Sequence, residues 1–182
     1  MTRSEHPSGS DRIAEVAENI PCDYVVNIQG DEPLIDPDVI DAVTDALVNF
    51  EMATAATQIK SISDLENSNV VKAVIGLNGC ALYFSRRAVP FLRGAMDLPE
   101  AHQLKLFPFL KHLGIYAFRR ETLLRMVKFP PSPLEQAEKL EQLRALEHGV
   151  SIGVVKVDYD SIGVDTPEDV VRVEKIIHQS HP

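Results

Sequence analysis

Short β-branched runs alternate with helical segments along the 182-residue chain, and few folds accommodate that pattern. The runs at 23–29, 53–59 and 150–157 predict strands, since Val, Ile and Thr suit a pleated and buried surface. Between them, 37–50 and 134–148 repeat apolar residues at the spacing of one helix face. Alternating strands and helices predict an α/β domain, with a mainly parallel mixed sheet flanked by helices.

Capping residues mark the ends of several predicted helices. Ser10 or Asp11 is predicted to cap the first helix, because their side-chain oxygens accept N–H groups of the first turn. Asp36 is a possible cap of the next helix, where Pro37 suits the first turn. The residues Thr166-Pro167-Glu168-Asp169 predict a capping box at the start of the last helix. The 134–148 segment is predicted to form one amphipathic helix that Gly149 ends.

One hairpin and one irregular segment interrupt the alternation. Strands at 70–75 and 81–84 flank a turn bounded by glycines, which predicts a hairpin. Residues 86–111 hold three prolines and have no clean period, so we expect them to leave the core as an excursion. At 182 residues the chain is long enough for one buried core, and we expect a single domain over 1–182.

Charge and composition limit the classes of partner. With 18 Lys and Arg against 27 Asp and Glu, the net charge of −9 argues against nucleic acids and anionic membranes. No apolar run approaches the ~20 residues that span a bilayer, and residues 1–10 lack the apolar core of a signal peptide. Cys22 and Cys80 lie far apart and have no metal or redox spacing. These features predict a cytoplasmic protein without a membrane or nucleic-acid partner.

Acidic residues follow two of the predicted strands. Asp31 and Glu32 come directly after the 23–29 run, and Asp165 stands between a strand-like segment and the last helix. Open α/β sheets bind ligands at the carboxyl ends of their strands, where carboxylates would hold a hard cation such as Mg²⁺. A solvated turn at 31–32 and helix capping by Asp165 explain the same pattern.

Further polar positions are candidates for binding a small anionic substrate. Residues 8–12 lead into a helix whose exposed amides could hold a phosphate or a ribose. Alternation along the strand at 112–118 places His112, Gly114 and Tyr116 on one face, where they could bind a hydroxyl or a carboxylate. An ordinary solvated cap and a structural histidine are the respective alternatives.

The residue pattern alone does not decide where a nucleotide or an anion would bind. No glycine-rich phosphate loop of the Walker or dinucleotide type occurs, so either a nucleotide is bound differently or an N-terminal part is absent. Arg86 and Arg87 suggest an anion site or are simply solvated. Glu141 and Gln142 fit the polar side of the 134–148 helix equally well.

Eight segments, in order along nearly the whole chain, carry a resemblance to one family. They are Ser8-Gly-Ser-Asp-Arg12, Asn27-Ile-Gln-Gly-Asp-Glu-Pro-Leu-Ile35, Val70-Val-Lys72, Ala81-Leu-Tyr-Phe-Ser-Arg86, Lys111-His-Leu-Gly-Ile-Tyr116, Leu134-Glu135, Glu138-Lys-Leu-Glu-Gln-Leu-Arg144 and Gly163-Val-Asp-Thr-Pro-Glu-Asp169. Together they resemble the 3-deoxy-manno-octulosonate (KDO) cytidylyltransferases. The resemblance implies a fold like that of the nucleotide-diphospho-sugar transferases.

The resemblance also implies a reaction and an assembly. CTP and KDO would give CMP-KDO and pyrophosphate for lipopolysaccharide biosynthesis, the anomeric hydroxyl of the sugar acid attacking the α-phosphate. Asp31 and Asp165 would be the catalytic residues and the ligands of Mg²⁺. A homodimer is implied as well, with residues 86–111 as its dimerisation arm.

Binding residues follow from the same resemblance. Residues that match the cytidine side of the nucleotide site are Ser8, Gly9, Asp11 and Arg12. Residues that match the sugar-acid pocket are Gln29, Arg86, His112, Tyr116, Glu141 and Gln142. Arg86 would pair with the sugar carboxylate, Gln29 would shape the pocket beside Asp31, and the others would contact hydroxyl groups.

Two departures from the family pattern bear on the activity. Ser10 stands where the family usually has Thr, which keeps the hydroxyl. The family's opening strand and basic phosphate loop have no counterpart, so we expect the chain to start inside the family pattern. One alternative function is therefore a non-catalytic remnant that binds the sugar acid or partner subunits. Another is a cytidylyltransferase for a related acid, such as an amino analogue of KDO or a sialic acid.

Overall fold

The computed structural model describes residues 2–6, 8–30, 32–95, 99–159, 164 and 167–180. Its helices are α1 (Gly9–Glu18), α2 (Pro37–Asp45), α3 (Ile62–Glu66), α4 (Glu100–Leu106), α5 (Arg120–Met126), α6 (Pro133–Glu138), α7 (Gln142–Glu147) and α8 (Pro167–Ser180), with 3₁₀ turns η1 (Ala46–Val48) and η2 (Arg93–Ala95). Its strands are β1 (Tyr24–Asn27), β2 (Met52–Gln58), β3 (Lys72–Ile75), β4 (Ala81–Ser85), β5 (Leu110–Arg119) and β6 (Ile152–Lys156).

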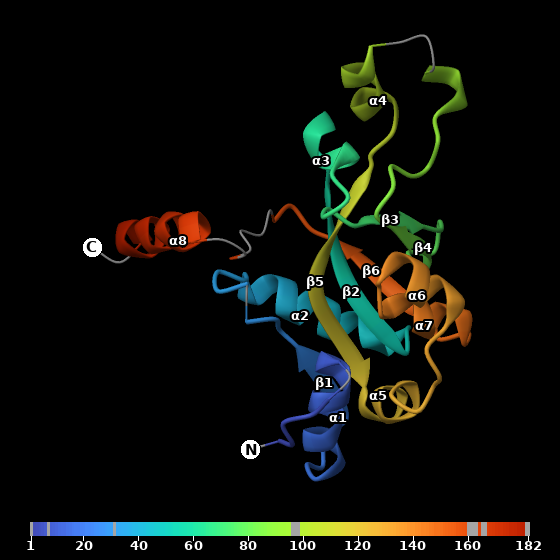
Figure 1. Ribbon diagram of the computed structural model, residues 1–182, viewed down its shortest axis with the longest axis vertical. Coiled ribbons are helices and arrows are strands. Elements are labelled where there is room, and N and C mark those ends of the chain that lie inside the picture. Colours follow the sequence, from blue (N-terminus) through green and yellow to red (C-terminus); the bar gives the residue numbers. More distant parts are fainter. Residues whose placement is uncertain are drawn as a thin grey trace.

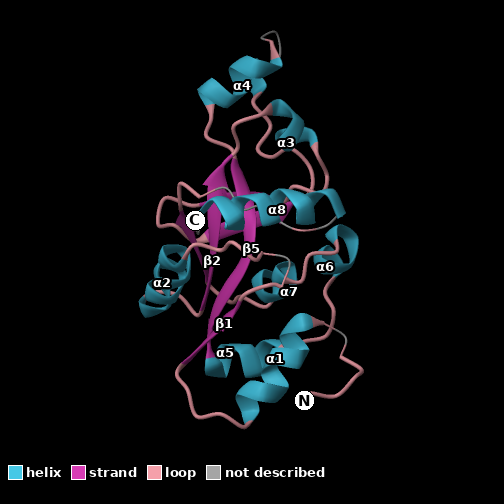
Figure 2. Cartoon of the chain, turned by 90° about the vertical axis from the view of Figure 1, so that its left-hand side faces the viewer, coloured by secondary structure: helices cyan, strands magenta, loops and turns pink. Residues whose placement is uncertain are grey.

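The six strands of the described residues form one sheet (Figure 1). Their order is β4-β3-β5-β2-β6, and β1 pairs with the carboxyl-terminal half of β5. One face packs against α2 and η1, and the other packs against α1, α5 and α7 (Figure 2). The predicted α/β class and the mixed sheet flanked by helices are confirmed.

The pairing within this sheet is mainly antiparallel, which corrects the expected mainly parallel sheet. Strands β1, β2, β3 and β6 run in one direction, but β5 runs against β1, β2 and β3, and among the described ladders only β2 with β6 is parallel. The excursion is the reason, since α4 stands beyond the carboxyl end of β2 (Figure 1). The chain therefore re-enters the sheet with Leu110 opposite Gln58 and must run back along β2.

Strand β1 is shorter and less buried than the 23–29 run predicts. It covers Tyr24–Asn27, with Tyr24 exposed and the other three residues half-buried. In the described part of the chain β1 pairs only with β5, so one of its edges has no neighbouring strand to cover it.

Helix α1 is capped two to three residues earlier than the sequence suggests. The side chain of Ser8, rather than that of Ser10 or Asp11, accepts the N–H of Asp11 at 3.2 Å. Ser10 is then the second helical residue and is buried. At α2 the expected pattern holds, because Asp36 caps the helix directly before Pro37.

The predicted helix at 134–148 is two helices, α6 and α7. Lys139 ends α6 with a left-handed backbone conformation (φ 55°), which breaks the helical path although no proline or glycine stands there. The break changes the direction of the chain just before Glu141 and Gln142. Helical spacing alone continues through this point, so the sequence pattern does not reveal the break.

The described part of the predicted excursion stands away from the sheet around α4 (Figure 1), but Leu110 and Lys111 already belong to β5. Its described part contains η2 and α4, and residues 96–98 lie outside the described residues. Ile59, Leu65 and Phe109 form a small separate core at its base. Among the described helices none is long and apolar enough to cross a membrane.

Candidate active site

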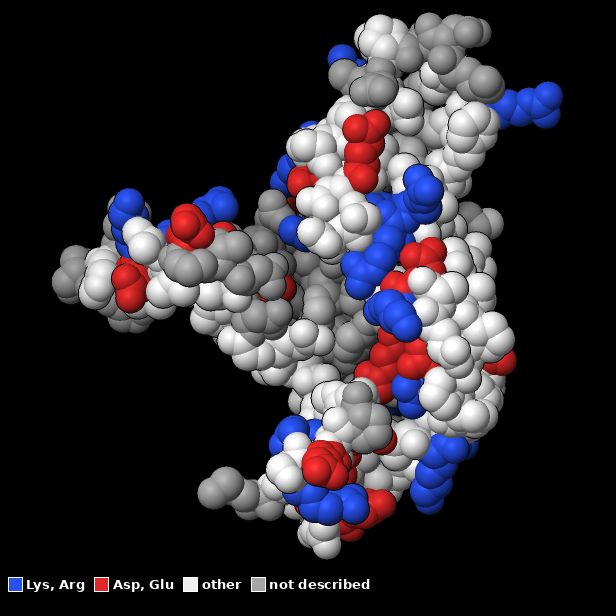
Figure 3. Space-filling view, in the orientation of Figure 1, with Lys and Arg blue, Asp and Glu red and all other residues white. Residues whose placement is uncertain are grey.

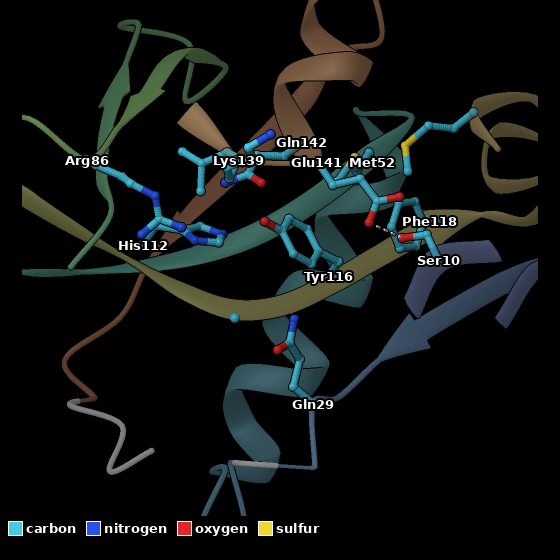
Figure 4. Close-up of a pocket in the computed structure, with 13 residues that line it drawn as sticks. Ser10, Gln29, Met52, Arg86, His112, Tyr116, Phe118, Lys139, Glu141 and Gln142 are labelled. Carbon is cyan, nitrogen blue, oxygen red and sulfur yellow. Dashed lines mark hydrogen bonds between the residues drawn. The ribbon is translucent and has the colours of Figure 1, made fainter. Parts of the chain in front are cut away.

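A pocket of about 370 Å³ lies beside β5 and the start of α7 (Figure 4). All six residues that match the sugar-acid site line it: Gln29, Arg86, His112, Tyr116, Glu141 and Gln142. The other lining residues are Ser10, Met52, Gly114, Phe118, Met126, Lys139 and Leu140. On the face shown in Figure 3 the molecule is hollowed below the excursion that carries α4, and both basic and acidic side chains border the hollow. Residues far apart in the sequence thus meet around one polar cavity.

Strand β5 provides one wall of the pocket. His112, Gly114 and Tyr116 all line it, as the predicted alternation requires. The His112 ring lies between those of Phe84 and Tyr116, with both centroid distances at 5.2 Å. Gln29 reaches over Gly114, whose added Cβ would stand 3.6 Å from the Gln29 side chain. A small residue here leaves the wall open to a ligand.

Arg86 brings a positive charge to the pocket. Its Nε donates to the backbone oxygen of Glu138 at 2.8 Å and its Nη1 to that of Ser68 at 3.0 Å. The Glu138 carboxylate accepts instead from the Arg86 backbone N–H at 2.9 Å and from Ser85 Oγ at 2.7 Å. Within the described residues no carboxylate forms an ion pair with the guanidinium, which suits it to bind an anion.

Lys72 holds the backbone behind Arg86. Its side chain is fully buried, and Nζ donates to the carbonyl oxygens of Asn67 (2.9 Å), Val70 (2.6 Å) and Arg86 (2.7 Å). Burial lowers the pKa of Lys72. Three carbonyls satisfy its three donors, so this lysine joins the loop before β3 to the end of β4.

Glu141 connects α7 with the start of α1. One of its carboxylate oxygens accepts from Ser10 Oγ at 3.0 Å. The other lies 2.8 Å from Ser8 Oγ, whose single proton is shared between Glu141 and Asp11. Burial raises the pKa of Tyr116, and the nearby negative charge of Glu141 raises it further, so the phenol is neutral. The break at Lys139 is what places Glu141 in this position.

The four residues matched to the cytidine side lie around the first turn of α1. Ser8 Oγ lies 2.7 Å from Asp11 Oδ2, next to Glu141, while Arg12 Nη1 donates to Thr2 Oγ1 at 2.8 Å and the Arg3 backbone oxygen at 3.3 Å. Gly9 begins the helix with open space around it. This cluster adjoins the pocket through Ser8 and Ser10.

The two predicted metal ligands, Asp31 and Asp165, lie outside the described residues. Among the residues that the structure does describe, no three His, Cys, Asp or Glu side chains are grouped closely enough to hold a metal ion. The assignment of Mg²⁺ to Asp31 and Asp165 therefore stays a prediction.

Sequence reasoning misses two polar residues of the pocket. Ser10 is not assigned to the sugar-acid pocket, and Lys139 is interpreted as part of a continuous helix, yet both line the cavity. The match of Ser10 to a family position with a hydroxyl is a usable signal. For Lys139 the sequence offers none, because its position depends on the left-handed turn.

His112 is expected to make the protein less stable in acid. Burial lowers its pKa from 6.5 to about 4 in the folded protein. The unfolded chain therefore binds a proton first, so the contribution is complete above pH 6.5 and falls as the pH drops toward 4. We expect a loss of up to about 3 kcal/mol in the free energy of unfolding, measured by urea titration at a series of pH values.

The matched comparison uses His112→Gln, which should lack this component, and His102→Gln, which changes an exposed histidine and should keep it. If the wild type and His112→Gln lose stability in parallel between about pH 6.5 and 4, the histidine is not the cause.

The mixed sheet flanked by helices is the fold of the cytidylyltransferase class. A family model described as "Cytidylyltransferase" matches residues 1–152. A solved 4-diphosphocytidyl-2C-methyl-D-erythritol synthase from Anaerococcus prevotii shares the fold at 14% identity, with a TM-score of 0.55, over 95% of this chain and 68% of that one. So does a 2-C-methyl-D-erythritol 4-phosphate cytidylyltransferase from Thermus thermophilus at 11% identity, with a TM-score of 0.57, over 95% of this chain and 70% of that one.

Comparison with curated relatives narrows the class to one family. The 3-deoxy-manno-octulosonate cytidylyltransferase of Geotalea daltonii is 48% identical over 178 residues, covering 95% of this chain and 70% of that protein. The protein of the same name from Solibacter usitatus is 46% identical, covering 99% of this chain and 69% of its own. A solved CMP:2-keto-3-deoxy-manno-octonic acid synthetase complexed with CTP superposes with a TM-score of 0.88 at 36% identity, covering 99% of this chain and 72% of that one. This chain belongs to the 3-deoxy-manno-octulosonate cytidylyltransferase family.

Proposed function

We propose that this chain transfers the cytidylyl group of CTP to KDO, giving CMP-KDO and pyrophosphate. The observation that carries the proposal is the polar pocket, where the residues matched to the sugar-acid site meet around a guanidinium that has no carboxylate partner in the described chain. In the reaction the anomeric oxygen of the sugar acid forms a bond to the α-phosphorus of CTP. The bond from that phosphorus to the bridging oxygen breaks, pyrophosphate leaves, and the hydroxyl proton is released.

Pocket residues of opposite charge bind different groups of the sugar acid. Arg86 offers only N–H donors and pairs with the sugar carboxylate, whereas the Glu141 carboxylate only accepts. Because Ser10 donates to one oxygen of Glu141 and the Ser8 hydroxyl lies 2.8 Å from the other, the orientation of Glu141 is set before a ligand arrives. Gln142 and Tyr116 present polar groups beside it. A polyhydroxylated acid meets complementary groups at both ends of this pocket.

The nucleotide binds next to the sugar acid, at the start of α1. Ser8, Gly9, Asp11 and Arg12 contact its cytidine side, and Ser8 also touches Glu141 of the sugar pocket. Asp31 and Asp165 would hold Mg²⁺, since carboxylate oxygens are the donors that suit a hard cation. Bound there, the ion would neutralise phosphate charge on the triphosphate.

We infer further that the single domain over 1–182 acts in the cytoplasm, in lipopolysaccharide biosynthesis, as a homodimer. Residues 86–111 serve as the dimerisation arm. Phe91 and Leu106 of this arm are 75% and 60% exposed, and covering such apolar side chains favours association.

Pyrophosphate release by the purified 182-residue chain tests the function directly. With CTP, KDO and Mg²⁺ we expect release that depends on all three components. Asp31→Asn should reduce it at least about a hundredfold without changing the thermal unfolding curve, because a lost metal ligand impairs charge neutralisation rather than packing.

The outcomes separate the alternatives. A folded chain that binds KDO but releases no pyrophosphate is a binding remnant rather than an enzyme. Faster release with a sialic acid or an amino analogue of KDO would assign a related acid as the substrate. Equal loss of thermal stability and activity in Asp31→Asn would give Asp31 a structural role.

A further inference from the structure

An irregularity in the pairing of β2 with β5 lies directly behind the pocket. Thr54 is opposite Tyr116, but the next residue, Ala55, is opposite Leu113. Gly114 and Ile115 therefore have no partner on β2, and the ladder of backbone hydrogen bonds is interrupted there. The Thr54 side chain, fully buried, lies in this interruption.

The Thr54 hydroxyl has three neighbours within hydrogen-bond distance. Its Oγ1 lies 2.7 Å from the Ile115 carbonyl oxygen, 3.3 Å from the Leu113 carbonyl oxygen and 2.9 Å from His112 Nε2. The hydroxyl has one proton, and carbonyl oxygens can only accept. At 2.7 Å the Ile115 oxygen requires that proton, since two oxygens this close without a hydrogen between them repel each other.

The direction of the remaining contact then follows. Because Thr54 donates to Ile115, its oxygen can only accept from His112, so Nε2 must carry the hydrogen. A neutral imidazole has one N–H, and burial favours the neutral form of His112. Nδ1 is left with a bare lone pair, and it makes no hydrogen bond to the described part of the chain.

We propose that Thr54 is a positioning residue that holds His112 in the Nε2–H tautomer, so that Nδ1 accepts a hydrogen bond from a hydroxyl of the sugar acid. This inference rests on the proposed function. Arg86 and His112 both line the pocket (Figure 4) and have opposite hydrogen-bonding characters. The lone pair of Nδ1 repels a carboxylate, while the guanidinium attracts one, so the tautomer sets which end of the acid faces each residue.

The tautomer can be read from ¹⁵N chemical shifts of the histidine rings in the full chain. His112→Gln identifies the His112 signals. In the wild type we expect Nε2 at the shift of a protonated nitrogen and Nδ1 at that of an unprotonated one. Thr54→Ser should keep this pattern, and Thr54→Val, of nearly the same shape but without the hydroxyl, should give a mixture of tautomers.

Kinetics give the second readout. Thr54→Val should raise the KM for KDO about tenfold, the loss of one hydrogen bond, with the KM for CTP unchanged, and Thr54→Ser should restore it to within about threefold. Thr57→Val is the matched control, because it alters a second buried threonine of β2 and leaves the contact between Thr54 Oγ1 and His112 Nε2 in place.

The two readouts distinguish failure of this inference from failure of the function. A protonated Nδ1 in the wild type, or an unchanged Nε2–H tautomer in Thr54→Val, overturns the inference even if the enzyme is active. The expected tautomers in a chain without turnover support the role of Thr54 and reject the proposed reaction. If Thr54→Val does not fold, the wild-type and Thr54→Ser spectra still decide the tautomer.

Discussion

Replacing Arg86 by alanine is expected to raise the KM for KDO about a hundredfold, while the KM for CTP stays within about a factor of two. Two of its N–H groups donate to the backbone oxygens of Glu138 and Ser68. These bonds fix the orientation of the planar guanidinium and leave its other N–H groups for the ligand. Losing a charge-assisted pair with a carboxylate therefore removes binding of the sugar acid and little else. Steady-state pyrophosphate release, with each substrate varied in turn, measures both constants.

Arg87→Ala is the matched control, because Arg87 is adjacent in sequence but exposed and absent from the pocket lining. It should behave as the wild type. Arg86→Lys keeps the charge but not the planar fork, so we expect an intermediate KM for KDO. A matched rise in both KM values for Arg86→Ala would show that Arg86 supports the whole site and does not bind the carboxylate specifically.

Replacing Arg144 by methionine is expected to lower the free energy of unfolding by about 3 kcal/mol or more. Its guanidinium donates to Glu135 at 2.8 Å and 2.5 Å, and the two side chains are only 9% and 14% exposed. The hydrogen bond from Arg144 is the main cause that lowers the pKa of Glu135, so the carboxylate would remain charged and poorly compensated. Urea unfolding measures the effect.

Two comparisons make this prediction specific. Arg125→Met breaks the more exposed pair with Glu51 and should cost about 1 kcal/mol or less. Adding Glu135→Leu to Arg144→Met should recover part of the stability, because the Glu135 carboxylate is then no longer left charged without its partner. A loss below about 1 kcal/mol in Arg144→Met would mean that packing alone joins α6 to α7.

Elements that depend on neighbouring residues are predictable from the sequence. The Asp36 cap before Pro37, the β3–β4 hairpin and the alternation that puts His112 and Tyr116 on one side all agree with the structure. In each case the deciding interactions span only a few residues. The matched segments also identify the family, because their order and spacing are properties of the sequence itself.

Features that depend on distant residues are not predictable in this way. The single helix expected at 134–148 is broken because Lys139 adopts a left-handed conformation, and Arg144 binds Glu135 across the break. The direction of β5 depends on where the excursion returns to the sheet. The periodicity of apolar residues predicts neither the break at Lys139 nor the direction of β5.

The sequence by itself determined the residue chemistry of this protein: which carboxylates, arginines and ring nitrogens are available, and the family whose pattern they follow. Only the tertiary structure decided how these groups face one another. Hydrogen-bond direction at His112 depends on Thr54 Oγ1, 2.9 Å away across the sheet and 58 positions away in the chain. Such contacts form when strands pair and helices pack, because side chains remote in sequence share a site only after the backbone between them has been placed.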